Sequence, residues 1–231
     1  GAGSVDGLAG STDATPNNPV GGTFDNIDSV ISDGEGGSTL TGANTANTWN
    51  IVAADSGTLN GIAFSGMANL VGGTLVDTFN IGPAGTLSGD ITGGTGNDLI
   101  TQADGANTWD ITLPDEGDVT DIGSFSGIEN LTGGSGADTF NISGGDLTGN
   151  LSGAAGDDTF VFSDTRTIGG NVDGGADTDT LDLDAYTTNV DFTISGAGSV
   201  DGLAGSTSAD TVVPDPNPIS GTFDNIDSVI S

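Results

Sequence analysis

The chain of 231 residues contains no lysine, histidine or cysteine, and Arg166 is its only basic residue. Nucleic-acid binding requires several Lys or Arg side chains to neutralise phosphates, so a nucleic-acid partner is excluded. No disulfide can cross-link the fold, and chemistry through a thiol, an imidazole or a lysine amine is excluded as well. No apolar run approaches the roughly 20 residues of a membrane span, so we expect no membrane insertion.

Acidic residues and glycine dominate what remains. The chain has 33 acidic residues, a net charge of -32 and 42 glycines, and nearly all its acids are Asp. Thr, Val, Ile and nine Phe recur at regular intervals, whereas disordered chains lack such residues. Asp, Thr and Gly without Lys or much Glu favour turns and strands over helices, so we expect an all-β fold.

Two long segments occur twice. Residues 1–12 and 196–207 both read GAGSVDGLAGST, and residues 23–32 and 222–231 both read TFDNIDSVIS. The stretch between them varies in length and is proline-rich in both copies, which is typical of a loop. We interpret residues 1–32 as the tail of a preceding tandem unit and 33–231 as one full unit with a Pro-rich insertion loop near 208–220. The chain is therefore expected to be part of a longer array.

A shorter period lies inside this unit. Segments of the type Asp-Thr-Phe-Asn-Ile recur, and their opening aspartates form a regular ladder: Asp77, Asp98, Asp118, Asp138, Asp158 and Asp179. The step of this ladder is constant to within one residue, and a fixed period of about 20 residues is typical of a solenoid. Short strands that restart in the same direction after each glycine turn predict a right-handed parallel β-solenoid (a β-helix or β-roll) with about 20 residues per coil.

Alternation along each strand places Phe and Ile inside and Thr and Asn outside. The stacked apolar positions are expected to form one core column, which consists of Phe79, Leu99, Phe140, Phe160 and Leu181. Trp49 and Trp109 lie on the apolar side of their strands. We expect both to pack in the core, and carbohydrate stacking by exposed Trp is the alternative.

The turns carry the recognisable chemistry. Residues 93–98 and 133–138 match the pattern GGxGxD, and residues 72–77, 153–158 and 174–179 are looser versions. This pattern resembles the repeats-in-toxin (haemolysin-type) proteins, whose glycine-rich turns hold calcium. The resemblance implies calcium ligands from Asp side chains and glycine carbonyls. The coil length is instead similar to that of giant surface adhesins of the filamentous-haemagglutinin type, which implies a secreted protein whose coils need no metal.

An electrostatic argument bears on calcium independently. Aspartates of successive coils would fall in one corner column about 4.8 Å apart, where bare carboxylates repel. Divalent cations bound by oxygen ligands would compensate, or each Asp could cap its own turn and point to solvent. The predicted ligands at the stronger corner are Asp138, Asp157, Asp158 and Asp179 with Gly134, Gly136 and Gly156. The weaker corner has Asp77 and Asp98 with Gly94 and Gly96.

These observations favour a structural function. We expect a stiff acidic rod in an extracellular adhesin stalk or cell-surface fibre, with identical repeat units and divalent cations as its partners. A subunit of a self-assembling filament or matrix is the alternative. An ice-binding face is a minor one, because its Thr-x-Asn row is broken by Asp110, Val161 and Asp182. A polysaccharide-active β-helix enzyme is the other minor alternative, but we expect no enzyme, since Arg166 is the only basic residue and no carboxylate pair stands out.

Overall fold

The computed structural model describes residues 8–11, 23–32, 37–103, 105–187, 189–209 and 216–231. These residues form 24 strands and no helix, so the all-β prediction is confirmed for them. None of their segments is a helix that could cross a membrane. Much of the predicted tail 1–32 and of the Pro-rich loop (residues 1–7, 12–22 and 210–215) lies outside the described residues.

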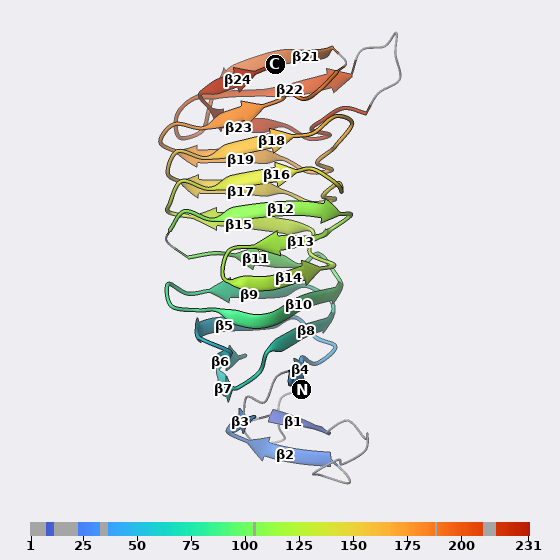
Figure 1. The fold of residues 1–231 in the computed structure, drawn as a ribbon, viewed down its shortest axis with the longest axis vertical. Helices are drawn as coiled ribbons and strands as arrows, with labels where there is room; N and C mark the ends of the chain where they lie inside the picture. Colours follow the sequence, from blue (N-terminus) through green and yellow to red (C-terminus); the bar gives the residue numbers. More distant parts are fainter. Residues whose placement is uncertain (1–7, 12–22, 33–36, 104, 188, 210–215) are drawn as a thin grey trace.

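Two large sheets contain nearly all the strands (Figure 1). In spatial order, the ten-stranded sheet consists of β24 (Ser228–Ile230), β20 (Thr180–Asp182), β18 (Thr159–Phe162), β16 (Thr139–Ile142), β12 (Thr108–Leu113), β13 (Glu116–Val119), β14 (Ile122–Ser126), β10 (Leu87–Thr95), β8 (Asn69–Thr74) and β4 (Thr39–Thr41). The twelve-stranded sheet consists of β21 (Val190–Ala197), β22 (Leu203–Ala209), β23 (Phe223–Ile226), β19 (Val172–Ala176), β17 (Leu151–Ala155), β15 (Asn130–Gly134), β11 (Leu99–Thr101), β9 (Asp77–Ile81), β5 (Asn47–Ala53), β6 (Ser56–Leu59), β7 (Ile62–Ser65) and β3 (Ser29–Ile31). A separate antiparallel pair joins β1 (Leu8–Ser11) to β2 (Thr23–Ile27).

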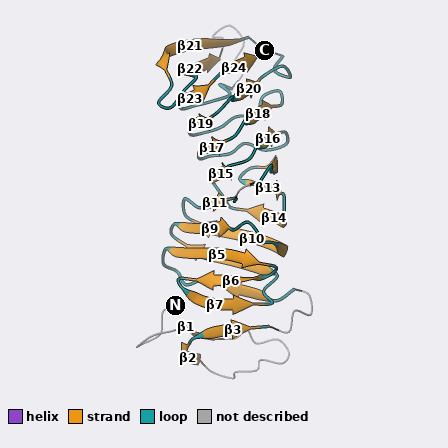
Figure 2. Ribbon diagram, turned by 90° about the vertical axis from the view of Figure 1, so that its left-hand side faces the viewer, coloured by secondary structure: helices purple, strands orange, loops and turns teal. Residues whose placement is uncertain are grey.

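The chain passes back and forth between the two sheets. From β14 to β20, each strand lies in the other sheet from the strand before it, and the neighbours within each sheet are parallel. Figure 2 shows the resulting stack of strands from the side. In-register partners such as Phe140, Phe160 and Leu181 lie one period of the aspartate ladder apart in the chain. Neither sheet closes on itself, because each ends in two edge strands.

The core lies between the sheets and has the predicted side chains. Along β16 the burial alternates, with Phe140 and Ile142 buried and Thr139 and Asn141 partly exposed. Trp109 is fully buried, and so is Trp49, so the core assignment of both is confirmed. Aromatic rings stack from layer to layer: Trp109 on Phe140 at a centroid distance of 5.5 Å and Phe140 on Phe160 at 5.1 Å.

The expected single core column is wrong in two respects. Ile100, and not Leu99, faces the core and pairs in register with Phe79. Phe79 stacks on Trp49 in the twelve-stranded sheet, whereas Phe140 and Phe160 lie in the ten-stranded sheet. Strand β12 directly follows β11 in the chain, and no strand that ends in glycines lies between them. The Asp-Thr-Phe type of strand therefore changes from the twelve-stranded to the ten-stranded sheet at this point, which splits the column.

Antiparallel hairpins interrupt the parallel pairing of the strands, and the sequence analysis did not predict them. Strands β5, β6 and β7 pair antiparallel in succession, and so do β12, β13 and β14. Asn60 and Gly61, with φ of 51° and 87°, form the turn between β6 and β7. An Asn-Gly pair with positive φ at both residues is a strong hairpin signal. Asp118 lies on β13 with its side chain exposed, so its place in the aspartate ladder was wrong.

Replacing Phe140 by Ala tests the core assignment. Its ring is sandwiched between Trp109 and Phe160, so we expect a loss of about 3–5 kcal/mol in the free energy of unfolding. Thr139→Ala, on the outer face of the same strand, should cost less than about 0.5 kcal/mol. Chemical denaturation measures both, and the reverse order would contradict the assignment.

Candidate functional site

The ladder aspartates other than Asp118 are buried at or just before the start of a strand and fall into two rows, so the expected single column is wrong. Each row runs across one sheet, and a hydrogen bond joins each member of the row to the next. The first row, along the twelve-stranded sheet, is Asn47, Asp77, Asp98 and Glu129. The second row, along the ten-stranded sheet, is Asn107, Asp138, Asp158, Asp179 and Asp227. The last member of each row is less buried: Glu129 is partly exposed and Asp227 is exposed.

One hydrogen bond repeats along both rows. The carboxylate of each member accepts the backbone N–H of the member one layer before it. The N–H of Asp138 donates to Oδ1 of Asp158 at 2.7 Å, and the N–H of Asp158 donates to Asp179 at 2.9 Å. In the first row the N–H of Asp77 donates to Asp98 at 2.7 Å, and the N–H of Asp98 to Glu129 at 2.6 Å. The aspartates therefore cap the neighbouring layer from a buried position, whereas capping of their own turns, with the side chain in solvent, was the alternative to calcium in the sequence analysis.

Each row starts with an asparagine in place of an aspartate. The side-chain amide of Asn47 donates to Oδ1 of Asp77 at 2.7 Å, and that of Asn107 donates to Asp138 at 2.9 Å. Both amides also reach turn carbonyls, those of Gly72 and Gly133. The neutral amide supplies a second donor to the first carboxylate and adds no charge to the row.

The second oxygen of the ladder aspartates explains the first glycine of the turn motif. Oδ2 of Asp158 is buried and has no hydrogen-bond partner among the described residues, and the same holds for the other four ladder aspartates that lie in the rows. A Cβ at Gly153, five residues before Asp158, would overlap that oxygen. Gly133 stands in the same relation to Asp138. Only glycine leaves space for the carboxylate at this position.

The remaining turn glycines allow the layers to approach closely. Gly94 and Gly134 have φ of +106° and +126°, a conformation that L side chains rarely adopt. A Cβ at Gly96, Gly136 or Gly156 would overlap backbone atoms of the preceding layer. Asp157 accepts the N–H of Thr178 through Oδ1 at 2.9 Å. The calcium-ligand role of these residues stays a prediction.

Burial raises the pKa of the row aspartates. It raises the pKa of Asp158 to about 7, with neighbouring Asp138 and Asp179 adding to the effect. It raises the pKa of Asp98 and of Asp179 to about 6, again with help from nearby carboxylates. Burial also raises the pKa of Asp77 and Asp138, and the hydrogen bonds from the row-starting asparagines partly offset this.

Three aspartates converge at the end of the second row. Asp179, Asp201 and Asp227 each offer a carboxylate oxygen, and these atoms lie within 4.8 Å of one another. The N–H of Asp179 donates to Oδ2 of Asp227 at 3.0 Å, and that of Asp177 donates to Oδ2 of Asp201 at 3.2 Å. Oδ1 of Asp201 and Oδ2 of Asp179 are buried and unpartnered within the described residues. This aspartate triad could hold a metal ion.

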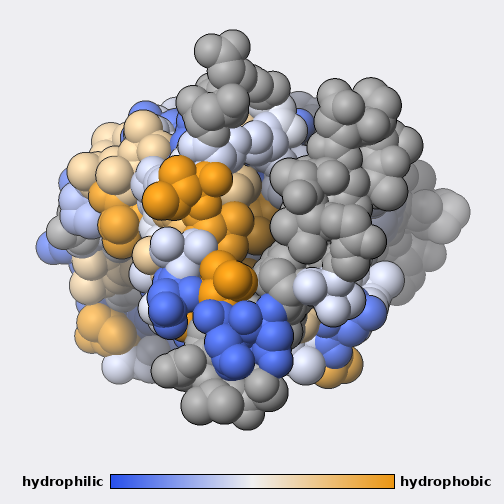
Figure 3. Space-filling view, turned by 90° about the horizontal axis from the view of Figure 1, so that it is seen from below, coloured by the Kyte–Doolittle hydropathy of each residue, from blue (hydrophilic) through white to orange (hydrophobic). Residues whose placement is uncertain are grey.

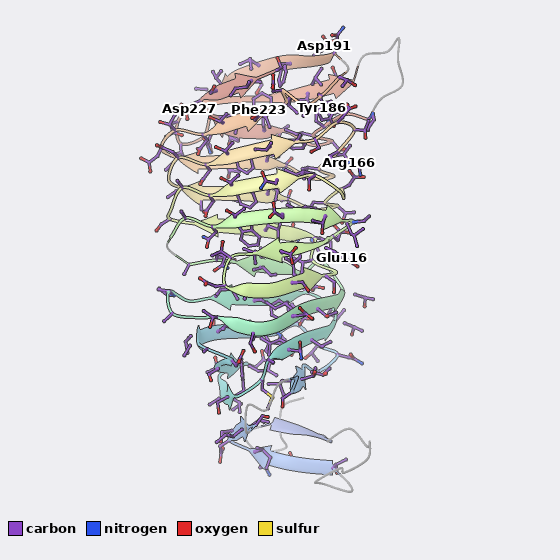
Figure 4. The ribbon with its side chains drawn as sticks, in the orientation of Figure 1. Glu116, Arg166, Tyr186, Asp191, Phe223 and Asp227 are labelled. Carbon is purple, nitrogen blue, oxygen red and sulfur yellow. The ribbon has the colours of Figure 1, made fainter. Side chains whose placement is uncertain are left out.

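The sequence analysis predicted Asp179 of the triad as a calcium ligand and did not predict the other two. Asp201 lies between β21 and β22, and Asp227 immediately precedes β24, so their meeting depends on how these strands fold back. In Figure 4, Asp227 lies on the opposite side of the stack from Arg166. Arg166 forms an ion pair with Asp146 at 3.8 Å, consistent with a surface role away from the triad.

Comparisons of the chain with models of protein families, with curated proteins and with solved structures found no match. The resemblance to repeats-in-toxin proteins and to filamentous adhesins therefore rests on the turn motifs and the coil length. What the geometry establishes by itself is an all-β stack with two rows of mostly buried carboxylates and one aspartate triad.

The raised pKa of Asp98 predicts a pH effect on stability. Its folded-state pKa of about 6 exceeds its ordinary value, so its contribution to stability is present at about pH 4 and is lost as the pH rises through 6. In Asp98→Asn, which keeps an acceptor oxygen, the free energy of unfolding should fall less between pH 4 and pH 8 than in the wild type. Asp118→Asn, which removes one exposed charge, is the control. Denaturant titration in a chelator measures all three, and equal pH slopes would contradict the prediction.

Because the Asp158 carboxylate leaves no space for a side chain at Gly153, we predict that two Gly→Ala substitutions will differ in their effect on stability. Gly153→Ala should lower the free energy of unfolding by about 1–3 kcal/mol, because the new methyl group displaces the Asp158 carboxylate. Gly196→Ala is the matched control, since nothing lies within 4 Å of a Cβ there. Thermal melting compares the two variants, and equal melting temperatures would show that the carboxylate does not occupy this place.

Proposed function

We propose that the chain is a structural repeat module of a very large secreted bacterial surface protein, in which it serves as a stiff acidic rod. The observation that carries the proposal is the core: one cluster of buried hydrophobic side chains runs through the stack from Trp49 to Ile226. No single layer can bury its apolar face, so stability comes from neighbouring layers. The length of such a module then scales with the number of layers, which is the property that an adhesin stalk or an extracellular fibre requires.

The proposed architecture is a right-handed parallel β-solenoid with one coil per step of the aspartate ladder, interrupted by the hairpins at β5–β7 and β12–β14. Two observations support it. The chain alternates between the two sheets, and residues paired in register lie one step of the aspartate ladder apart in the sequence. Side chains that stack in identical positions, as Thr139, Thr159 and Thr180 do, are what successive coils of a solenoid produce.

Calcium is the ion that we propose for the aspartate triad. Calcium prefers several oxygen ligands, and carboxylates that converge within 4.8 Å provide them. Burial and then the repulsion among the three carboxylates raise the pKa of Asp179, and a bound ion would offset that repulsion. The remaining surface charge would keep rods soluble and mutually repelling until cations screen them.

The length of concatenated units tests the proposed function. Ten strands about 4.8 Å apart give a rise on the order of 48 Å per unit. Chains with one, two and three copies of residues 33–231 should therefore lengthen by this amount per copy in small-angle X-ray scattering. A maximum dimension that does not grow linearly would contradict the rod. Sedimentation of single copies as filaments would favour the self-assembling alternative.

Calcium should raise the melting temperature through the triad. We expect calorimetry to show a higher melting temperature for the wild-type chain in calcium than in excess chelator, because the ion binds the folded state. Asp201→Asn should lose most of this shift, and Asp191→Asn, which removes an exposed charge on β21, should keep it. The shift should be smaller at pH 5 than at pH 8, since protons compete for Asp179. Equal shifts in both variants would exclude the triad as the site.

A further inference from the structure

The segment that occurs twice in the sequence folds alike at both ends of the molecule. In residues 23–32 and in their copy, 222–231, the asparagine next to the end of the first strand has positive φ: 56° at Asn26 of β2 and 55° at Asn225 of β23. In both copies the N–H of this asparagine donates to Oδ1 of the preceding aspartate at 3.0 Å. We call residues 23–32 and 222–231 the two copies of the junction segment.

The strand that precedes each copy also pairs in the same register. Leu8 of β1 is opposite Ile27 of β2, and Leu203 of β22 is opposite Ile226 of β23. These are equivalent positions of the repeated sequence, and both pairings are antiparallel. The two copies therefore have the same local structure although their surroundings differ.

The last strand of each copy contacts a different neighbour. In the first copy, β3 lies parallel to β7, which follows it in the chain, with Val30 opposite Phe64. In the second copy, β24 lies parallel to β20, which precedes it, with Val229 opposite Leu181. Each strand is an edge of its sheet, so each copy displays one of two possible pairings. Phe64 and Leu181 are both core residues.

Different residues of the segment form the backbone hydrogen bonds at the ends of the two pairings. In the first copy the N–H of Ser32 donates to the carbonyl of Ser65 beyond β7. In the second copy the N–H of Ser228 and the carbonyl of Ile230 bond with the β20 side, and these two residues correspond to positions 29 and 31. A strand inside a parallel sheet directs alternate residues to its two neighbours. One strand of this sequence can thus make both pairings at the same time.

We propose that the junction segment joins consecutive units by strand sharing. Its last strand pairs with β20 of the preceding unit through one edge and with β7 of the following unit through the other. The ten-stranded sheet of one unit thereby continues into the twelve-stranded sheet of the next. The shared valine, which is 37% exposed as Val229, fills the core between Leu181 and the next unit's Phe64.

The exposed apolar groups at the two ends agree with this junction. Among the described residues, six of the ten exposed large hydrophobic side chains belong to the end strands and their connections: Ile31, Ile194, Val200, Leu203, Val229 and Ile230. Figure 3, which views the molecule from the end that carries β3, shows hydrophobic residues gathered on this face. A following or preceding unit would cover such residues, whereas the rest of the stack exposes few of them.

A disulfide cross-link tests the pairing directly. This inference rests on the proposed tandem arrangement, so the test uses residues 1–231 followed by a second copy of 33–231. Ile31 is opposite Ser65, so Ile230→Cys in the first copy and Ser65→Cys in the second should form a disulfide within the chain. The chain has no native cysteine to compete. Asp182→Cys with Ile230→Cys, an in-register pair of the single copy, is the positive control.

The negative control moves the second cysteine out of register. With Ala63→Cys in place of Ser65→Cys, the Cα atoms would be about 8 Å apart, too far for a disulfide. Efficient oxidation of the Ser65 pair and little of the Ala63 pair is the expected result. Equal oxidation of both, or of neither, would overturn strand sharing. If scattering still showed a length that grows with copy number, the rod proposal would survive while the junction proposal failed.

Val229→Asp provides a second readout. In the single copy it should change the denaturation midpoint little, because the side chain is at an open edge. In the tandem chain, Val229→Asp in the first copy should remove the rise in midpoint that joining the copies produces. A tandem chain with the midpoint of a single copy, before any substitution, would also overturn the proposal.

Discussion

The contact between successive layers is the constraint on which the rest of the structure depends. A layer has two short strands and cannot bury its own apolar face, so its aromatic rings stack on those of its neighbours. At the corner of each layer, a buried carboxylate of the next layer accepts the N–H that would otherwise lack a partner. Ring and carboxylate together fix the register, because both must meet an equivalent group one layer away.

Burying a row of carboxylates has an electrostatic cost, and several features of the chain reduce it. Asn47 and Asn107 begin the rows with neutral donors, and burial raises the pKa of Asp158 to about 7, so that it is partly protonated near neutral pH. The glycines before each aspartate make room for the carboxylate, but its second oxygen has no donor among the described residues, so part of the cost remains. At the end of the second row three carboxylates converge, and there the triad provides ligands for a cation. The proposed rod is thus most sensitive to cations near the junction segment.

The sequence predicted what depends on local pattern and failed where distant segments meet. Alternation at period two identified Phe140 as buried and Thr139 as outward, and the step of the aspartate ladder identified their partners in the next layer. Leu99 was misassigned because Leu99 and Ile100 are both apolar and only the register distinguishes them. Asn60-Gly61 indicates a hairpin, but a fixed period favours uniform coils and hides it. The two rows and the triad depend on sheet exchange after β11 and on the folding of β21–β24, which no local pattern specifies.

Hydrogen exchange of the row amides tests the central claim most directly. The backbone N–H groups of Asp77, Asp138 and Asp158 each donate to a buried carboxylate of the next layer. If this bond holds the layers together, these amides exchange only through global unfolding and are among the slowest in the chain. Native-state hydrogen exchange, followed by NMR, would then give these amides a free energy of opening equal to the free energy of global unfolding. Exchange as fast as that of amides in exposed turns would contradict the account.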